Sequence, residues 1–179
     1  MKTAIETERL LMRELLPTDA AGMFELDSDP EVHRYLGNNP LTDIAQSREM
    51  IANIRKQYTD NGIGRWAVIL KETNEFIGWS GLKLERNRNE REEFYDLGYR
   101  FIQKHWGKGY ATESAKAFLD FGFNEMKLET ICICADIGNA GSRNVIEKLG
   151  FRFLNLFKYK EEDVAWYEMT KEEYLLAHS

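Results

Sequence analysis

The chain has 179 residues, of which 43% are hydrophobic and 30% are charged, and its formal net charge at pH 7 is −6. This composition predicts a single soluble domain (1–179) with a substantial core, and the negative charge argues against a nucleic-acid partner. No apolar run approaches the roughly 20 residues that span a bilayer, and the opening residues MKTAIETERL lack the apolar core of a signal peptide. We therefore expect a cytoplasmic protein with no membrane partner.

The cysteines and histidines form no pattern typical of a metal or redox site. Cys132 and Cys134 are two residues apart, so both point to one face of a strand, and packing is the expected role. The three histidines do not have the spacing of metal ligands. We expect no metal.

The first third of the chain reads as one strand followed by helices, which Pro17 and Asp29-Pro30 separate. The expected elements are a strand over Glu8–Leu15, a helix from Thr18 or Asp19 to about Leu26, a short helical piece over Glu31–Leu36, and a helix from Thr42 or Asp43 to about Tyr58. Asp60-Asn61-Gly62 ends the last helix.

From Arg65 onward the apolar spacing is mostly that of strands. The expected elements are strands Arg65–Lys71, Phe76–Glu85 and Phe94–Ile102, a helix Gly107–Met126, a strand Thr130–Ala135, a helix Ser142–Leu149, and a hairpin of Phe151–Lys160 and Val164–Met169. The helix Gly107–Met126 has core-facing spacings at Ala111, Ala115, Phe118, Leu119 and Phe123. The wholly polar segment 86–91 predicts a mobile hairpin loop.

The connections between these elements indicate the topology. Only the strand–helix–strand unit around the helix 107–126 is long enough for a parallel crossover. The expected fold class is α/β (α+β): a mixed, mostly antiparallel central sheet of about seven strands with helices on both faces. The alternating run EDVAWYEM predicts a strand whose exposed face would support dimers through edge pairing, so the protein is a monomer or a homodimer.

The segment YRFIQKHWGKGYAT carries the clearest functional signal. Gly107 and Gly109 allow the backbone to curl so that several N–H groups converge at the start of a helix, which favours an anion. Lys104 and Lys108 flank this turn, so the anion expected is a phosphate group.

Three known types of phosphate-binding loop are candidates for this glycine-containing segment. The Walker pattern GxxxxGK[ST] is not supplied by this segment. A dinucleotide fingerprint would need a glycine at Thr112, although Asp136 at the end of the next strand would suit a ribose. A coenzyme A pyrophosphate loop is favoured.

Two segments resemble motifs of one enzyme superfamily. KHWGKGYATES is similar to motif A of the Gcn5-related N-acetyltransferases (GNAT), and NAGSRNVIEKLGF is similar to motif B. The segment TERLLMRELLPTDA, with Gly98-Tyr99, resembles the branch that includes ribosomal-protein N-terminal (RimJ/RimL-like) acetyltransferases. One departure is that the motif's Arg or Gln position falls on Lys104, with Gln103 one residue early.

The resemblance implies acetyl-CoA as co-substrate and an amine as acceptor. Pantetheine would pair with the strands Phe94–Ile102 and Thr130–Ala135 where they splay apart, and Gly98 is compatible with a bulge there. The cofactor-binding residues implied are Arg100, Phe101, Ile102, Lys104, Trp106, Gly107, Lys108, Gly109, Tyr110, Ala111, Thr112, Asn139 and Ser142. The backbone of residues 100–102 would donate to the thioester carbonyl, and Lys104 would face the phosphates.

The catalytic residues are less defined. Many relatives have a tyrosine acid seven residues after the motif-B asparagine, here Ile146, whereas the RimJ/RimL-like branch has a serine, matched by Ser142. Ser142 would protonate the leaving thiolate or only contact the sulfur. Asp96 is the first choice as base, with Glu93, Glu85 or water as alternatives.

Three functions are therefore open at this point. The first is acetyl transfer to a protein N-terminus, peptide, amino acid or polyamine. The second is an acyl-CoA-binding module without catalysis, and the third is a nucleotide-binding regulator. The first two helices and the segment Arg86–Glu92 would select the acceptor.

Overall fold

A single eight-stranded sheet organises the protein. The computed structural model describes residues 2–179, with strand order β1-β2-β3-β4-β5-β6-β8-β7. The strands are β1 (Ala4–Glu6), β2 (Leu10–Glu14), β3 (Trp66–Leu70), β4 (Glu75–Arg88), β5 (Arg91–Phe101), β6 (Thr130–Asp136), β7 (Arg152–Tyr159) and β8 (Glu162–Thr170). Only β5 and β6 pair in parallel. The predicted mixed, mostly antiparallel sheet is confirmed, with eight strands rather than about seven.

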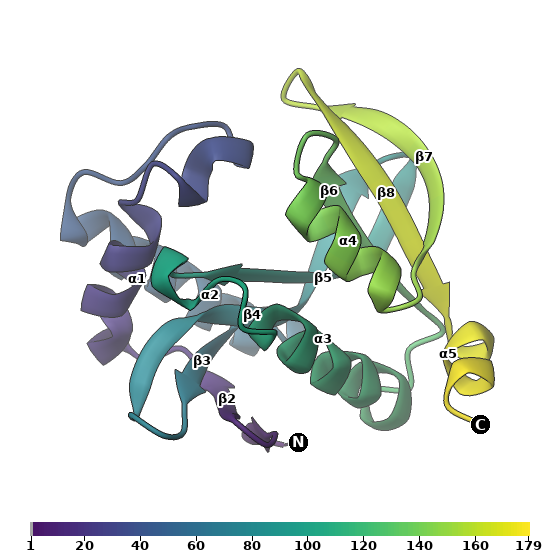
Figure 1. Cartoon of the computed structure of the whole chain (residues 1–179), viewed down its shortest axis with the longest axis horizontal. Coiled ribbons are helices and arrows are strands. Elements are labelled where there is room, and N and C mark those ends of the chain that lie inside the picture. Colours follow the sequence, from purple (N-terminus) through teal and green to yellow (C-terminus); the bar gives the residue numbers. More distant parts are fainter. Residues whose placement is uncertain (1) are drawn as a thin grey trace.

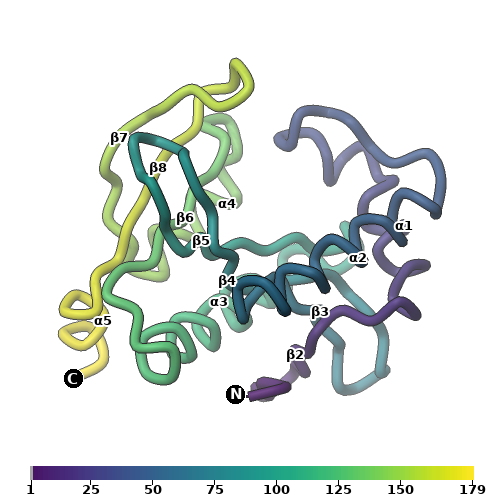
Figure 2. Tube along the Cα trace, turned by 180° about the vertical axis from the view of Figure 1, so that it is seen from behind, coloured from purple at the N-terminus to yellow at the C-terminus, as the bar shows by residue number. Residues whose placement is uncertain are grey.

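Helices cover both faces of this sheet. They are α1 (Ala20–Asp27), α2 (Ile44–Asn61), α3 (Tyr110–Asp120), α4 (Ala140–Lys148) and α5 (Lys171–Ala177), with single turns η1 (Pro17–Asp19), η2 (Val32–Tyr35), η3 (Gln103–His105) and η4 (Phe121–Glu125). Seen from opposite sides, α3 and α4 are near in Figure 1 and α2 is near in Figure 2. None of the helices within residues 2–179 is long and apolar enough to cross a membrane.

The helix boundaries follow local signals that the sequence contains. The side chain of Asp43 accepts a hydrogen bond from the Ala45 N–H and caps α2, and Gly62 ends that helix with a φ of 74°. The strand β1 and the helix α5 were missed, because each is too short to show a periodic pattern.

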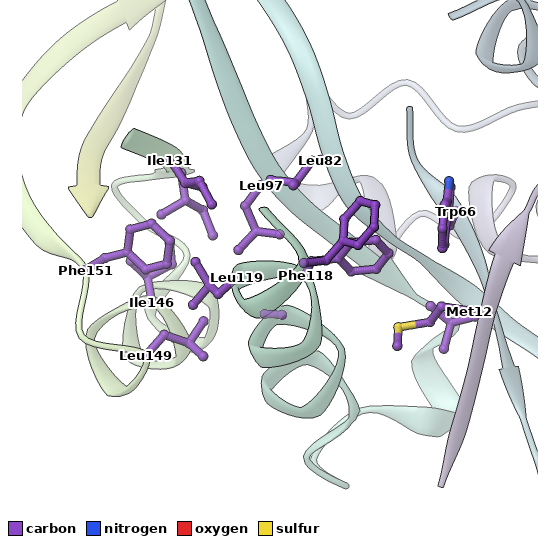
Figure 3. Close-up of a cluster of buried hydrophobic side chains, with 14 of the residues drawn as sticks. Met12, Trp66, Leu82, Leu97, Phe118, Leu119, Ile131, Ile146, Leu149 and Phe151 are labelled. Atoms are coloured by element: carbon purple, nitrogen blue, oxygen red, sulfur yellow. The ribbon is translucent and has the colours of Figure 1, made fainter. Parts of the chain in front are cut away.

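The largest core lies between the sheet and α3. Phe118 and Leu119 of α3 project between Trp66 on one side and Ile131 on the other, as Figure 3 shows. The rings of Trp66 and Phe118 pack edge to face with centroids 5.6 Å apart. The predicted core-facing spacing of this helix is thereby confirmed. A second core lies beneath α1 and α2 on the opposite face of the sheet.

The segment 86–91 is not the loop that its polarity predicted. Strands β4 and β5 continue through it, and a two-residue turn at Asn89 and Glu90 joins them with φ angles of 48° and 61°. Asn89 exchanges side-chain hydrogen bonds of 3.2 and 3.0 Å with Asn155 on β7. Polar composition misled here because the hairpin tip packs on a distant strand.

The prediction of an exposed face on EDVAWYEM is wrong. This segment belongs to β8, which pairs with β6 on one side and β7 on the other, and its residues 164–169 are buried. The near-continuous apolar run VAWY is typical of a strand that is buried on both faces. The sheet edge lies at β7 instead, with Phe153 and Leu156 exposed.

Candidate active site

An open gap between β5 and β6 forms the centre of the candidate site. These parallel strands share a single paired position, Asp96 with Cys132. Beyond it β5 continues to Phe101 against β4, and β6 continues to Asp136 against β8. Each strand therefore turns one row of backbone groups toward the gap, where a ligand amide could pair with them. This is the splaying that the family resemblance implied.

The backbone at the end of β5 is partly committed to other partners. The Ile102 N–H donates to the Ile77 carbonyl at 3.0 Å, so the prediction that it serves a ligand is wrong. Successive N–H groups of a strand alternate in direction, so the Phe101 N–H points toward the gap. The Trp106 indole N–H donates to the Phe101 carbonyl at 2.8 Å and covers that end of the strand.

Gly98 has a different role from the bulge that was predicted. The β4–β5 register runs without interruption through the Gly81–Gly98 pair. A Cβ on Gly98 would lie 2.8 Å from Nη2 of Arg65. Glycine is needed here because the Arg65 guanidinium occupies the space of a side chain.

The glycine turn after β5 leads into helix α3, and no side chain caps the N-terminus of that helix. Gly107 and Gly109 have φ angles of 72° and 82°, which glycine adopts without strain. Gly109 is the N-cap of α3 and no side chain caps it, while the Glu113 N–H makes the first helical bond, to the Gly109 carbonyl. The N–H groups of the first turn thus remain available to an anion, as predicted.

Lys104 does not face this turn. Its Nζ lies 2.7 Å from Glu75 Oε1 and 3.6 Å from Glu25 Oε1, and the hydrogen bond with Glu75 raises the pKa of this exposed lysine. The prediction of a phosphate-facing cation at this position is therefore wrong. The carboxylates that attract Lys104 come from distant parts of the chain, which the local motif does not show.

Arg9 lies beside the glycine turn, where the sequence had predicted Lys104. Its Nη1 donates to the Lys108 carbonyl at 2.8 Å, its guanidinium lies 4.5 Å from the centre of the Tyr110 ring, and its Nε donates to Glu113 Oε2 at 2.7 Å. Burial raises the pKa of Glu113, but hydrogen bonds from Thr7 and Arg9 outweigh it, so the net pKa is lowered. Arg9 braces the turn, while Glu113 balances its charge.

The first turn of α4 brings a hydroxyl pair to the gap. The Asn139 side chain accepts from the Ser142 N–H at 3.1 Å and caps the helix. The Tyr99 hydroxyl on β5 lies 3.1 Å from Ser142 Oγ. Burial raises the pKa of Tyr99, with the Ser142 hydrogen bond acting against it, so Tyr99 keeps its proton at neutral pH. The sequence had marked Tyr99 through the resemblance of Gly98-Tyr99 to the RimJ/RimL-like branch.

Asp96 lies in a buried ion pair. It is 6% exposed, and its carboxylate accepts from Nη2 of Arg65, whose Nη1 donates to the carbonyls of Asp96 and Gly81 at 2.6 Å. Burial raises the pKa of Asp96, and Arg65 opposes that effect. The two alternative bases are also paired, Glu93 with Arg86 and Glu85 with Lys83.

Comparison with known proteins agrees with this geometry. Residues 9–152 match the family model of the acetyltransferase (GNAT) domain. An uncharacterized N-acetyltransferase, p20 of Bacillus licheniformis, is 34% identical over 94% of this chain and 96% of its own length.

Two solved structures share the fold. A ribosomal-protein-S5-alanine acetyltransferase from Vibrio fischeri has a TM-score of 0.77 at 17% identity, covering 96% of this chain and 98% of its own. A spermidine N-acetyltransferase from Vibrio cholerae, in complex with CoA and spermine, has a TM-score of 0.76 at 21% identity, covering 94% of this chain and 99% of its own. Their names give different acceptors, so the fold alone does not identify the acceptor. The family model spans most of the chain, and p20 matches the chain nearly end to end. The protein therefore belongs to the GNAT family and is an acetyltransferase.

Proposed function

We propose that the protein transfers an acetyl group from acetyl-CoA to a primary amine by direct attack of the amine on the thioester. The observation that carries this proposal is the continuity of the open β5–β6 gap with the uncapped N-terminus of α3. The gap suits the amides of pantetheine, and the turn suits a pyrophosphate. Within the family, the resemblance of the opening segment supports the RimJ/RimL-like branch.

Different residues around the gap would bind different parts of acetyl-CoA. The first-turn N–H groups of Tyr110, Ala111 and Thr112, with Lys108, hold the phosphates, and Arg9 positions the turn. The Phe101 N–H donates to the thioester carbonyl, whereas the backbone groups of Arg100 point toward β4 by the same alternation and are not available to the ligand. Asn139, besides capping α4, borders the pantetheine path.

The reaction requires one bond to form and one to break. The amine nitrogen bonds to the carbonyl carbon, the carbon–sulfur bond breaks, the amine loses a proton and the sulfur gains one. Ser142 donates a hydrogen bond to the leaving sulfur while it accepts one from Tyr99. For the base we propose water rather than Asp96, because Arg65 holds that carboxylate.

The Ser142→Ala variant tests the hydroxyl. We expect its turnover number to fall by about 10-fold or more, since a group that helps the thiolate leave acts mainly in the transition state. The Kd for acetyl-CoA should change little. The Tyr99→Phe variant should lower the rate less, because Ser142 retains its own hydroxyl. A wild-type rate in the Ser142→Ala variant would remove the residue from the mechanism.

The function itself is tested by calorimetric titration with acetyl-CoA, CoA and NADH, followed by a thiol-release assay with amine acceptors. We expect the two CoA compounds to bind and NADH not to bind. Binding of acetyl-CoA without turnover of any primary amine would favour the acyl-CoA-binding module. Binding of NADH alone would refute the proposal and favour a nucleotide-binding protein.

A further inference from the structure

A groove opens on the face of the sheet opposite α3 and α4. It has a volume of about 240 Å³. Its lining consists of Met50, Ile54, Gln57, Arg65, Trp79, Lys83 and Arg100. Helix α2 supplies the first three of these residues, and β4 and β5 supply Trp79, Lys83 and Arg100.

The groove lies directly behind the candidate active site. Side chains alternate across a strand, so Tyr99 faces Ser142 while Arg100 faces the groove. The guanidinium of Arg65 fills the space beside Gly98, on the same stretch of β5 that borders the gap. An acceptor seated in the groove would therefore approach the thioester from the side opposite α4.

The charges that face the groove are all positive. Arg65, Lys83 and Arg100 line it, and no carboxylate is among its lining residues within the described chain. Each has an acidic partner: Asp96 binds Arg65, Glu85 Oε1 lies 2.6 Å from the Lys83 Nζ, and Asp27, which is fully buried, accepts from Arg100 Nη1 at 2.6 Å. Both terminal nitrogens of Arg65 are bound to Asp96 and to backbone carbonyls, so Lys83 and Arg100 are the cations that offer donors to a ligand in the groove.

Arg100 has unused hydrogen-bonding capacity. Among residues 2–179 its guanidinium has one hydrogen-bond partner, Asp27, and its side chain is 20% exposed. Its central carbon lies 5.1 Å from the centre of the Trp79 ring, and this cation–π contact holds it beside that ring. A guanidinium fixed in this way suits a carboxylate oxygen pair.

Apart from Gln57, the rest of the groove wall is apolar. Met50 and Ile54 of α2 belong to the partly buried side chains that pack on the second core. Trp79 forms an aromatic floor beneath them. This combination suits a short hydrocarbon side chain beside the carboxylate site.

We propose that this groove binds the acceptor through its carboxylate, so that the acceptor is an amine carrying a carboxylate and an apolar side chain, such as an apolar amino acid or a short peptide. This proposal rests on the proposed function and narrows its acceptor class. A polyamine, which is polycationic, finds no carboxylate to bind among the residues that line the groove.

The test compares leucine with leucinamide, in which an amide replaces the carboxylate, and adds spermidine. All kcat/KM values are expressed per neutral amine, because the carboxylate also raises the pKa of the α-amine. In the thiol-release assay we expect the kcat/KM for leucine to exceed that for leucinamide by about 10- to 100-fold, as hydrogen bonds to a charged group allow. Equal values for the pair, or a preference for spermidine, would overturn the proposal.

The Lys83→Met variant tests whether the groove causes the preference for leucine over leucinamide. Glu85 keeps Arg88 as a partner 3.5 Å away, so no carboxylate is left uncompensated. We expect the KM for leucine to rise by about 10-fold, that for leucinamide to stay constant, and the Kd for acetyl-CoA to stay constant. An Arg100→Lys variant, which keeps a cation beside Asp27, should show the same selectivity loss. A leucine preference that survives both substitutions would place carboxylate recognition elsewhere.

A binding measurement separates this proposal from the proposed function. Titration with N-acetylleucine and N-acetylleucinamide requires no turnover and no acetyl-CoA. Tighter binding of the acid, lost in the Lys83→Met variant, supports the groove even where transfer fails. Equal binding of both compounds by a protein that binds acetyl-CoA overturns the groove proposal and leaves the proposed function intact.

Discussion

The Arg65→Met variant is expected to lose about 3–5 kcal/mol of unfolding free energy at neutral pH. The substitution removes the guanidinium that binds the Asp96 carboxylate and the carbonyls of Asp96 and Gly81. Asp96 is 6% exposed, so its charge would remain in the interior without a partner. Urea unfolding at neutral pH measures the loss, and the methionine retains most of the apolar volume of the arginine stem.

The Arg65→Met/Asp96→Leu double variant is the matched control. Replacing both partners removes the unpaired charge, so we expect it to be more stable than the Arg65→Met single variant. Additive losses in the double variant would show that the two residues do not interact.

The pH dependence gives a second check on the same pair. Burial holds the pKa of Asp96 above its usual value, and Arg65 opposes that rise. A raised carboxyl pKa means that the folded state binds the proton more readily than the unfolded chain, so this stabilising contribution is lost as pH rises through the folded pKa. Removing Arg65 leaves the effect of burial unopposed, so the pKa of Asp96 rises further in the variant, and the deficit of the variant should shrink on acidification below neutrality. A deficit that grows on acidification would contradict the buried charge.

The Gly107→Asp variant is expected to bind acetyl-CoA roughly 100-fold more weakly. The repulsion between the new carboxylate and a phosphate some 5 Å away is about 3 kcal/mol at an effective dielectric constant near 20. A Cβ on Gly107 would meet no atom within 4 Å in the described chain, so the fold has room for it. The new carboxylate would stand where the first-turn N–H groups converge. Calorimetric titration with acetyl-CoA and CoA measures the effect.

The Gly107→Asn variant isolates the charge from the backbone. Asparagine and aspartate have the same shape, and both tolerate the φ of 72° at this position better than most residues. We expect the asparagine variant to bind within about 10-fold of the wild type, because it carries no charge. Equal losses in both variants would mean that backbone strain, and not a phosphate, explains the effect.

Local patterns in the sequence determined several features of this protein. The apolar spacing of Ala115, Phe118 and Leu119 predicted the buried face of α3, because a helix has one period whatever surrounds it. The positive φ at Gly107 and Gly109 followed from glycine itself. The cap at Asn139 joins residues only three apart, so it was readable directly.

Only the tertiary structure decided which charged groups serve the site. Lys104 turns to Glu75 and Asp96 binds Arg65, while Arg9 crosses from the other end of the chain to brace the turn. Each of these contacts joins residues about 30 or more positions apart, and the contact geometry follows from how the sheet and helices pack. A motif records which residues lie near one another in sequence, whereas a charged side chain binds the nearest opposite charge in space.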